Sequence, residues 1–153
     1  MKLCIAAALA LIAATPVHAQ SAAPADYTTA VPLTGSWSYT VVPGGSQATF
    51  VDTASQFQLS LTCSRATRQV TIARPASNAA AFLFVWTTAQ ARNLPASYNP
   101  ATGRSSAIVA AWDPLLDAIA FSRGRFAVGV SGQGQAVLPA WPEPARVIED
   151  CRA

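Results

Sequence analysis

Two acidic residues at helical spacing are the first candidates for catalysis in this sequence. Asp113 and Asp117 are four residues apart, so a helix beginning near Asp113 would bring both carboxylates to one face. Paired carboxylates perform acid–base chemistry in glycoside hydrolases, where they face each other across a cleft. Asp113 also precedes Pro114, a combination typical of a helix start in which the aspartate is the N-cap. We therefore expect Asp113 to have a structural role.

Other catalytic and metal-binding patterns do not occur in the sequence. The only histidine is His18, which lies in a predicted leader, and no Gly-x-Ser-x-Gly motif accompanies the serines. The rest of the chain therefore has neither an imidazole general base nor a histidine metal ligand. We predict no catalytic, cofactor-binding or metal-binding residue. A small histidine-free hydrolase stays as an alternative, and it predicts a groove lined by Asp113 or Asp117, Trp112 and a facing acid.

Arginines are the remaining group that could bind a ligand. Arg65 and Arg68 fall in one predicted turn, and Arg123 and Arg125 fall in another. If the two turns share one end of the fold, these four side chains form a candidate anion-binding surface for phosphate, a lipid headgroup or an acidic partner. We favour ordinary solvated charges, because Lys2 is the only lysine. Ten basic against seven acidic residues is too small an excess for a nucleic-acid-binding surface.

The N-terminus has the organisation of a secretory signal peptide. Lys2 supplies a positive charge, residues 3–14 are almost entirely apolar, and small residues precede a cleavage position between Ala19 and Gln20. The apolar run is too short to span a bilayer. Residues 1–19 are thus predicted to be a cleaved signal peptide, with an uncleaved anchor as the alternative. This predicts a periplasmic or secreted protein with no transmembrane segment after cleavage.

Two cysteines, Cys63 and Cys151, are left once Cys4 is removed with the leader. An even pair in an exported chain indicates one disulfide, because exported proteins meet an oxidising compartment. Two buried thiols or a redox pair are the alternatives, although redox pairs usually occur as Cys-X-X-Cys. The bond would close a long loop, for which chain entropy predicts roughly 4–5 kcal/mol of stabilisation at most.

The clearest strand in the sequence covers residues 57–63. Phe57, Leu59, Leu61 and Cys63 alternate with small polar residues, which predicts an apolar face with Cys63 pointing into the core. Alternation and turn signals predict seven further strands, over residues 37–41, 48–52, 69–74, 80–87, 105–112, 125–130 and 135–138. The strand at 80–87 is apolar on both faces, which is typical of a central strand covered on both sides.

Two helices and one long loop complete the predicted elements. A short helix after Asp113 and a C-terminal helix after Trp141 are expected to bury apolar faces, respectively Leu115, Leu116 and Ile119, and Trp141, Ala145, Ile148 and Cys151. Residues 90–104 are rich in proline and turn residues and form the longest predicted irregular stretch. Residues 20–33 are predicted to be a flexible lead.

These elements predict a single domain over residues 34–153. The expected fold is mainly β, an antiparallel sandwich or flattened barrel of about eight strands, with a short late helix and a C-terminal helix. Two sequence runs, 113–128 and 138–152, together with the segments 35–39 and 59–63, resemble a family of small exported alphaproteobacterial proteins. A looser similarity runs to periplasmic proteins of the invasion-associated locus B type and the type VI secretion accessory type. The resemblance implies export and carries over no functional residue.

Export, one disulfide and the lack of reactive histidine or lysine after the leader favour a non-enzymatic role. We expect an exported envelope protein acting as a binding or accessory module, without a cofactor and without nucleic acid. Its partner would lie in the envelope and is not identified by the sequence; an anionic partner is one candidate. The alternatives are the small hydrolase acting on an envelope polymer and a structural component of an envelope assembly, which predicts a large exposed apolar patch.

Overall fold

The computed structural model describes residues 26–153, so the predicted signal peptide, Cys4, the cleavage position at Ala19 and Gln20, and the first part of the predicted lead lie outside the described residues. The described chain forms ten strands in two antiparallel sheets, with two helices late in the sequence. In chain order the elements are β1 (Gly35–Val42), β2 (Gly45–Asp52), β3 (Phe57–Ser64), β4 (Gln69–Pro75), β5 (Phe82–Trp86), β6 (Ala91–Pro95), β7 (Ser97–Asn99), β8 (Arg104–Ala110), α1 (Pro114–Ala120), β9 (Arg125–Val130), β10 (Gln135–Pro139) and α2 (Pro142–Arg152). The predicted fold class is confirmed.

The larger sheet has six strands in the order β1-β2-β3-β4-β8-β7. Its first four strands follow one another through short turns. Pro43 and Gly44 close the β1–β2 hairpin, and Gly44 has a φ of 77°, a conformation that glycine adopts without steric cost. Consecutive hairpins of this kind explain why neighbours in the sequence are also neighbours in this part of the sheet.

The strand β3 keeps the predicted alternation with one exception. Leu59, Leu61 and Cys63 face the core and are buried. Phe57 was predicted to share their face, but a β-bulge shifts the register so that Phe57 pairs with Val51. Directly paired residues point to the same face of a sheet, and a one-residue shift moves a side chain to the other face. Phe57 therefore lies on the face opposite to Leu59 and is only half-buried.

The smaller sheet has four strands in the order β10-β9-β5-β6. β5 is one of its two central strands, as its apolar residues on both faces predicted. Leu83 and Val85 are fully buried in the core, whereas Phe84 and Trp86 on the other face are partly covered. The ring of Tyr27 lies over this outer face, with centroid distances of 6.2 Å to Phe84 and 5.6 Å to Trp86.

Residues 26–33 belong to the segment predicted as a flexible lead, and in the structure they run along the small sheet. The N–H of Leu33 donates to the carbonyl oxygen of Val137 in β10 at 2.8 Å. Arg125 at the start of β9 donates to the carbonyl oxygen of Ala30. This segment therefore covers part of the outer face of β5 and contacts the edge of β10.

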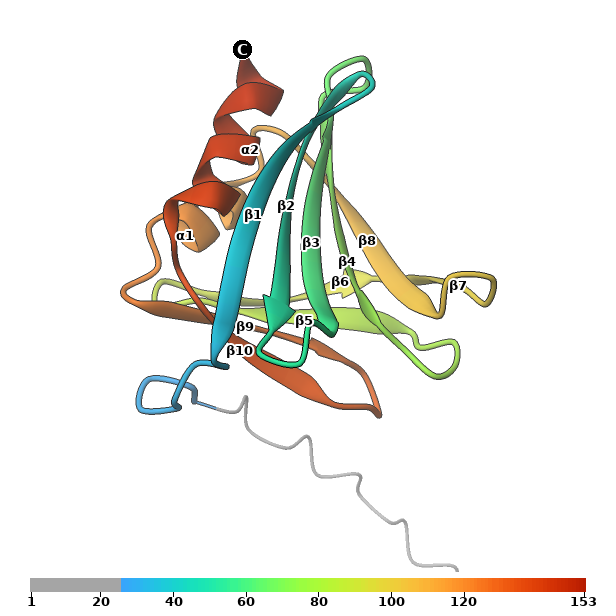
Figure 1. Cartoon of the computed structure of the whole chain (residues 1–153), viewed down its shortest axis with the longest axis vertical. Coiled ribbons are helices and arrows are strands. Elements are labelled where there is room, and N and C mark those ends of the chain that lie inside the picture. The colour runs from blue at the N-terminus through green and yellow to red at the C-terminus, as the bar shows by residue number, and fades with distance from the viewer. Residues whose placement is uncertain (1–25) are drawn as a thin grey trace, which may run out of the picture.

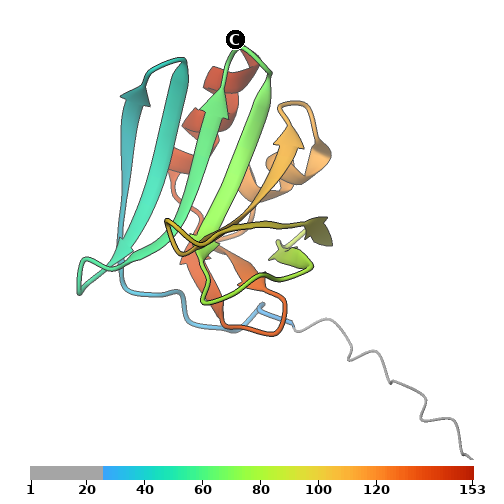
Figure 2. The ribbon, with the colours of Figure 1, turned by 90° about the vertical axis from the view of Figure 1, so that its right-hand side faces the viewer.

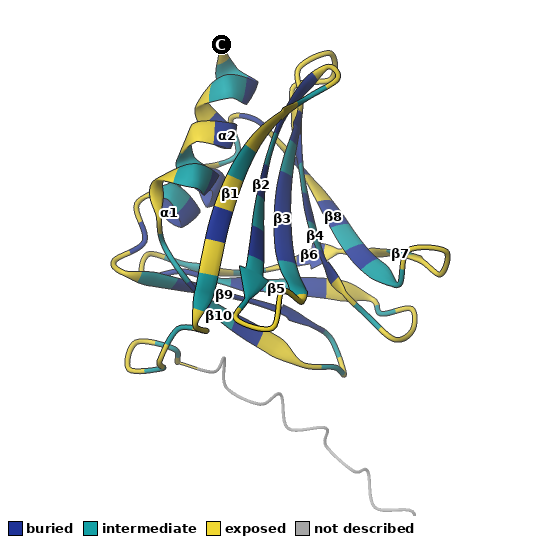
Figure 3. Ribbon diagram, viewed as in Figure 1, coloured by how far each residue is buried: buried dark blue, intermediate teal, exposed yellow. Residues whose placement is uncertain are grey.

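The core lies between the large sheet on one side and the small sheet and the two helices on the other. Figure 1 shows the small sheet crossing one end of the large sheet while the helices lie against the other end. Buried positions alternate with half-buried ones in β2 from Ser46 onward and within β4, and β1 has a single buried residue, Trp37 (Figure 3). The largest fully buried side chains come from both sheets and both helices, namely Phe50, Leu59, Leu61, Val70, Ile72, Leu83, Leu115, Leu116, Ile119, Phe126, Leu138 and Ile148. The sheets do not close into a barrel, so the sandwich is the arrangement observed.

The helix α1 begins as predicted. The side chain of Asp113 accepts a hydrogen bond from the N–H of Leu115 at 2.8 Å, and Pro114 is the first helical residue. Asp113 is therefore the N-cap. The inner face of the helix buries Leu115, Leu116 and Ile119.

The C-terminal helix α2 packs on the inner face of β1 to β4. Its buried residues are Pro144, Val147, Ile148 and Cys151. The prediction that Trp141 faces inward is wrong: Trp141 is the extended residue before the helix and is 45% exposed.

Cys151 forms the predicted disulfide with Cys63, with a Cα–Cα distance of 5.4 Å. The bond joins α2 to β3 across 88 residues of sequence.

The region 90–104 is not irregular, which corrects the prediction. It contains β6 and β7, and these two strands raise the number from about eight to ten. The sequence of β6, Ala-Arg-Asn-Leu-Pro, has no apolar alternation, and Leu94 is its one buried residue. These residues form strands because β6 pairs with β5 and β7 pairs with β8. The local sequence predicts neither pairing.

Candidate functional site

An open pocket of about 610 Å³ lies at the end of the small sheet away from the helices. The end of β4, the β4–β5 loop and the β9–β10 turn form its walls. It is lined by Arg74, residues 75–78 and residues 132–134. None of these residues is acidic, so the charge of Arg74 is the only formal charge on the pocket lining.

The side-chain amide of Gln133 joins the two loops of the pocket. Its Oε1 accepts hydrogen bonds from the N–H of Ser77 at 2.8 Å and from the hydroxyl of Ser77 at 3.1 Å. Its Nε2 donates to the carbonyl oxygen and to Oδ1 of Asn78, both at 3.0 Å. The hydroxyl of Tyr98 adds a hydrogen bond to the carbonyl oxygen of Ser77 at 3.3 Å. These bonds fix the rim of the pocket and occupy most of its polar groups.

Arg74 lies at the inner wall of the pocket. It follows Val70 and Ile72 at alternate positions of β4, so it faces the core, and it is 6% exposed. Its Nη1 donates to the carbonyl oxygen of Val128 in β9 at 2.6 Å, which links the two sheets. Its Nε is buried without a hydrogen-bond partner. Burial lowers the pKa of Arg74 to about 10, and the side chain stays positively charged at neutral pH.

A second buried polar group accompanies this arginine. Ser105 of β8 is the direct cross-strand neighbour of Arg74, is fully buried, and has a hydroxyl without a partner. Neither of the two salt bridges in the described part of the chain includes Arg74. A buried cation without a carboxylate is unfavourable, because its lost hydration is not replaced. An anion bound in the pocket would supply that compensation.

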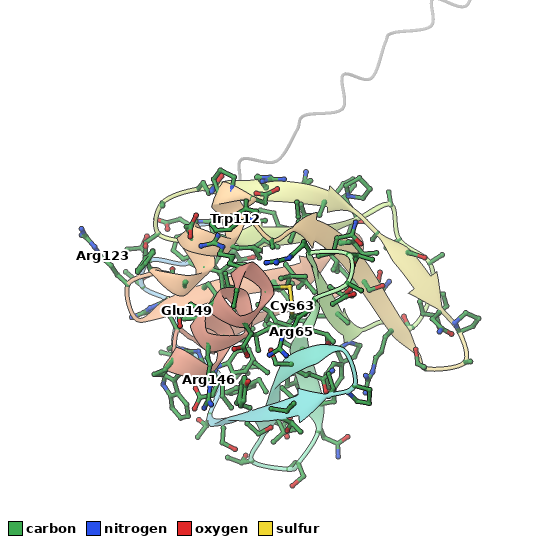
Figure 4. All side chains as sticks on the ribbon, turned by 90° about the horizontal axis from the view of Figure 1, so that it is seen from above. Cys63, Arg65, Trp112, Arg123, Arg146 and Glu149 are labelled. Carbon is green, nitrogen blue, oxygen red and sulfur yellow. A yellow bond between two sulfur atoms is a disulfide. The ribbon has the colours of Figure 1, made fainter. Side chains whose placement is uncertain are left out.

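The structure does not bring together the four arginines predicted as an anion-binding surface. Arg65 and Arg68 lie in the β3–β4 turn beside the end of α2. Arg123 and Arg125 lie where α1 leads into β9, and the N–H of Arg123 donates to Thr88 in the β5–β6 turn. Figure 4 shows Arg65 on one side of α2 and Arg123 pointing outward on the other. The two turns therefore do not form one surface.

The two aspartates considered for catalysis are held by arginines. Asp113 accepts a hydrogen bond from Arg92, and Asp117 accepts one from Nη1 of Arg152 at 2.7 Å. Partial burial acts to raise the pKa of Asp113, but hydrogen bonds from Arg92 and from a backbone N–H, with the charge of Arg92, together lower it. Trp112 is 68% exposed with Arg152 over its ring. These carboxylates are bound as ion pairs and do not face each other across a cleft.

Arg74 is not among the site residues predicted from the sequence, although a signal for it is present. The strand predicted over residues 69–74 already placed Val70 and Ile72 inward, and the same alternation places Arg74 inward. Arginine is rarely buried without a partner. The rim of the pocket had no comparable signal, because Gln133 meets Ser77 across 56 residues of sequence.

Comparison of the chain with protein-family models, curated proteins and solved structures finds no match. The resemblance to small exported alphaproteobacterial proteins therefore stays a prediction. Within residues 26–153, no group of three or more histidine, cysteine, aspartate or glutamate side chains could hold a metal ion. Neither helix of that region is long and apolar enough to cross a membrane.

Proposed function

We propose that the chain is an exported envelope protein that acts as a non-enzymatic binding module, and that its pocket binds an anionic group of the partner. The observation that supports this most is Arg74, a buried guanidinium on the wall of an open pocket that has no acidic residue. Its charge is not compensated by any carboxylate in the described part of the chain. Export itself is inferred from the leader sequence and from the disulfide.

A carboxylate is the anionic group that fits this guanidinium best. Nη1 of Arg74 is already bonded to Val128, and its unpaired Nε is buried out of reach of solvent, so Nη2 is the donor left to contact a ligand in the pocket. A hydrogen bond between a guanidinium and a carboxylate is strengthened by the two charges. The rim groups of Ser77, Asn78 and Gln133 bond mainly to one another. One positive charge with few spare donors suits a singly charged carboxylate better than a phosphate, which has more charge and more oxygens.

The two alternative functions receive less support. A hydrolase would need a carboxylate free to exchange protons, whereas Asp113 and Asp117 are engaged by arginines. A component of an envelope assembly would need a large apolar patch. The exposed apolar side chains are spread over elements in different parts of the fold, among them Val41 in β1, Phe82 in β5 and Ile108 in β8.

The proposal can be tested by an NMR titration of the purified protein with acetate, and with inorganic phosphate in parallel. We expect acetate to shift the amide signals of residues 75–78 and 132–134 at millimolar concentrations, because a single charge-assisted contact gives weak affinity. Phosphate should bind more weakly. A lysine at position 74 keeps the charge but has no second nitrogen to reach the pocket while the first bonds Val128, so Arg74→Lys should weaken acetate binding.

A matched pair of variants separates pocket binding from general charge effects. Asn78→Asp keeps the shape of the side chain and its ability to accept from Gln133, but it adds a negative charge at the rim. It should weaken acetate binding several-fold. Asn93→Asp adds the same charge at an exposed position of β6 and should leave binding unchanged. Acetate shifts that do not respond to Asn78→Asp would contradict the proposal.

A further inference from the structure

Three of the four sheet edges carry features that block pairing with another strand. β7 is three residues long, β6 contains Arg92 and Pro95, and β10 receives a hydrogen bond from Leu33. β1 is eight residues long, contains no charged residue and no proline, and pairs with β2 without a register shift. Short length, charge, proline, bulges and covering segments are the usual protections of edge strands. Among the residues that the structure describes, nothing gives β1 any of these protections.

The backbone of β1 is available for pairing on its outer side. Figure 2 shows β1 as the outermost strand of the large sheet, and its only strand partner is β2. The two-residue turn after Val42 makes Val42 and Gly45 the first hydrogen-bonded pair of the hairpin. Hydrogen bonding in antiparallel strands alternates, so the N–H and C=O groups of Trp37, Tyr39 and Val41 point away from β2.

We propose that β1 pairs with β1 of a second copy of this chain, which gives a two-fold symmetric dimer with a sheet continuous through both subunits. Antiparallel pairing centred on Tyr39 uses the free backbone groups and places Trp37 opposite Val41 of the partner subunit. Val41 is 68% exposed, and this pairing covers it. On the outer face the same register places Ser38 opposite Thr40 of the partner subunit, a favourable cross-strand pair.

The charges beside the proposed axis favour a second copy over an extended segment of another protein. The hydroxyl of Tyr39 donates to Oδ2 of Asp150 at 2.6 Å, and the guanidinium of Arg146 lies 3.9 Å from the centroid of the Tyr39 ring. Figure 4 shows Arg146 on the side of α2 that faces the β1–β2 hairpin. Each subunit therefore brings one cation and one anion to the axis, and Arg146 can face the partner subunit's Asp150.

The oligomeric state tests this proposal independently of the pocket. We expect light scattering coupled to size exclusion to give a dimer mass at micromolar concentrations. Val41→Lys places a charge on the open edge and should give a monomer. The side chain of Val41 is exposed, so its loss should not affect folding. Ile108→Lys is the matched control. Ile108 is 60% exposed on β8, and three strands separate β8 from β1 in the large sheet, so this variant should stay dimeric.

The register can be tested by cross-linking. Chains with Ser38→Cys and chains with Thr40→Cys, mixed and mildly oxidised, should form disulfide-linked heterodimers in preference to either homodimer. A wild-type protein that is monomeric at all concentrations would overturn the proposal, as would a dimer that Val41→Lys leaves intact. A monomer that instead binds a synthetic peptide of another sequence at β1 would assign this edge to a different partner and also overturn it.

Discussion

Arg152 and Arg74 lie toward opposite ends of the large sheet, and they differ in what surrounds their charge. Arg152 donates from Nη1 to Asp117 at 2.7 Å and from Nε to the carbonyl oxygen of Ala111 at 2.7 Å. Its Nη2 is without a partner, but its charge is compensated by a carboxylate. Within residues 26–153, Arg74 has one hydrogen bond, to the carbonyl oxygen of Val128, and no carboxylate partner.

We propose that this difference separates a structural end of the molecule from an end that binds a ligand. At the helix-covered end, Arg152 joins α2 to α1 and to the end of β8, and the disulfide joins α2 to β3. A charge compensated within the fold is not available to a ligand. At the pocket end, the charge of Arg74 is uncompensated and lines an opening. We expect substitutions at the first end to change stability and substitutions at the second to change binding.

Removal of the disulfide should have the largest effect. The double variant Cys63→Ala/Cys151→Ala should lower the free energy of unfolding by roughly 2–5 kcal/mol, because the unfolded chain gains the freedom of a long loop. Urea denaturation measures this loss. Acetate binding by the folded fraction should not change, since the pocket lies away from α2. A loss of acetate affinity in a variant that is still folded would break the division between the two ends.

The two arginines provide the next test. Arg152→Met removes the partner of Asp117 and should cost about 1–2 kcal/mol of unfolding free energy. Arg74→Met leaves no carboxylate unpaired and removes a desolvated charge, so its effect on stability should stay within about 1 kcal/mol. Acetate titration should show the reverse order, with binding abolished by Arg74→Met and kept by Arg152→Met. Equal losses of stability in urea denaturation would contradict the comparison.

The helix-covered end was also the more predictable of the two from sequence. Apolar alternation in β3, the Asp113–Pro114 helix start and the even cysteine pair are local or compositional signals, and apart from Phe57 the structure confirms what each predicted. Local signals fail where pairing decides the structure. β6 and β7 are strands because β5 and β8 lie beside them, and Phe57 changes face because a bulge shifts its register.

The pocket end depends on contacts between distant segments. The alternation Val70, Ile72, Arg74 was enough to predict a buried arginine, but not that its neighbours would lack a carboxylate. That property follows from the meeting of the β4–β5 loop with the β9–β10 turn through Gln133. Topology of this kind is set by the packing of the whole chain and leaves no trace within either segment.

The N-cap of α1 gives a smaller effect at the structural end. Asp113→Ala removes the acceptor for the N–H of Leu115 and the partner of Arg92, and should cost about 1 kcal/mol. Asp113→Asn keeps a capping acceptor and loses only the ion pair with Arg92, so it should cost clearly less. Chemical denaturation of both variants separates the cap from the ion pair. If both lose the same free energy, the ion pair, and not the cap, is the main contribution of Asp113.

The smallest effect concerns acid stability. The hydrogen bond from Tyr39, outweighing partial burial and helped by nearby arginines, lowers the pKa of Asp150 in the folded protein. A lowered pKa contributes stability above the unfolded value near pH 4, and this stability is lost as the pH falls through the folded value. Tyr39→Phe should remove a few tenths of a kcal/mol at neutral pH, because solvent screens this group.

The control for that effect is the same substitution at the pocket end. Tyr98→Phe also removes a hydroxyl, but its hydroxyl bonds to the carbonyl oxygen of Ser77 and not to a carboxylate. Its effect on unfolding free energy should therefore be the same at pH 7 and at pH 3, whereas that of Tyr39→Phe should shrink at the lower pH. Both measurements belong in a Val41→Lys background, so that association through β1 does not enter. A pH-dependent effect of Tyr98→Phe would place a titrating group at the pocket rim and remove the electrostatic distinction between the two ends.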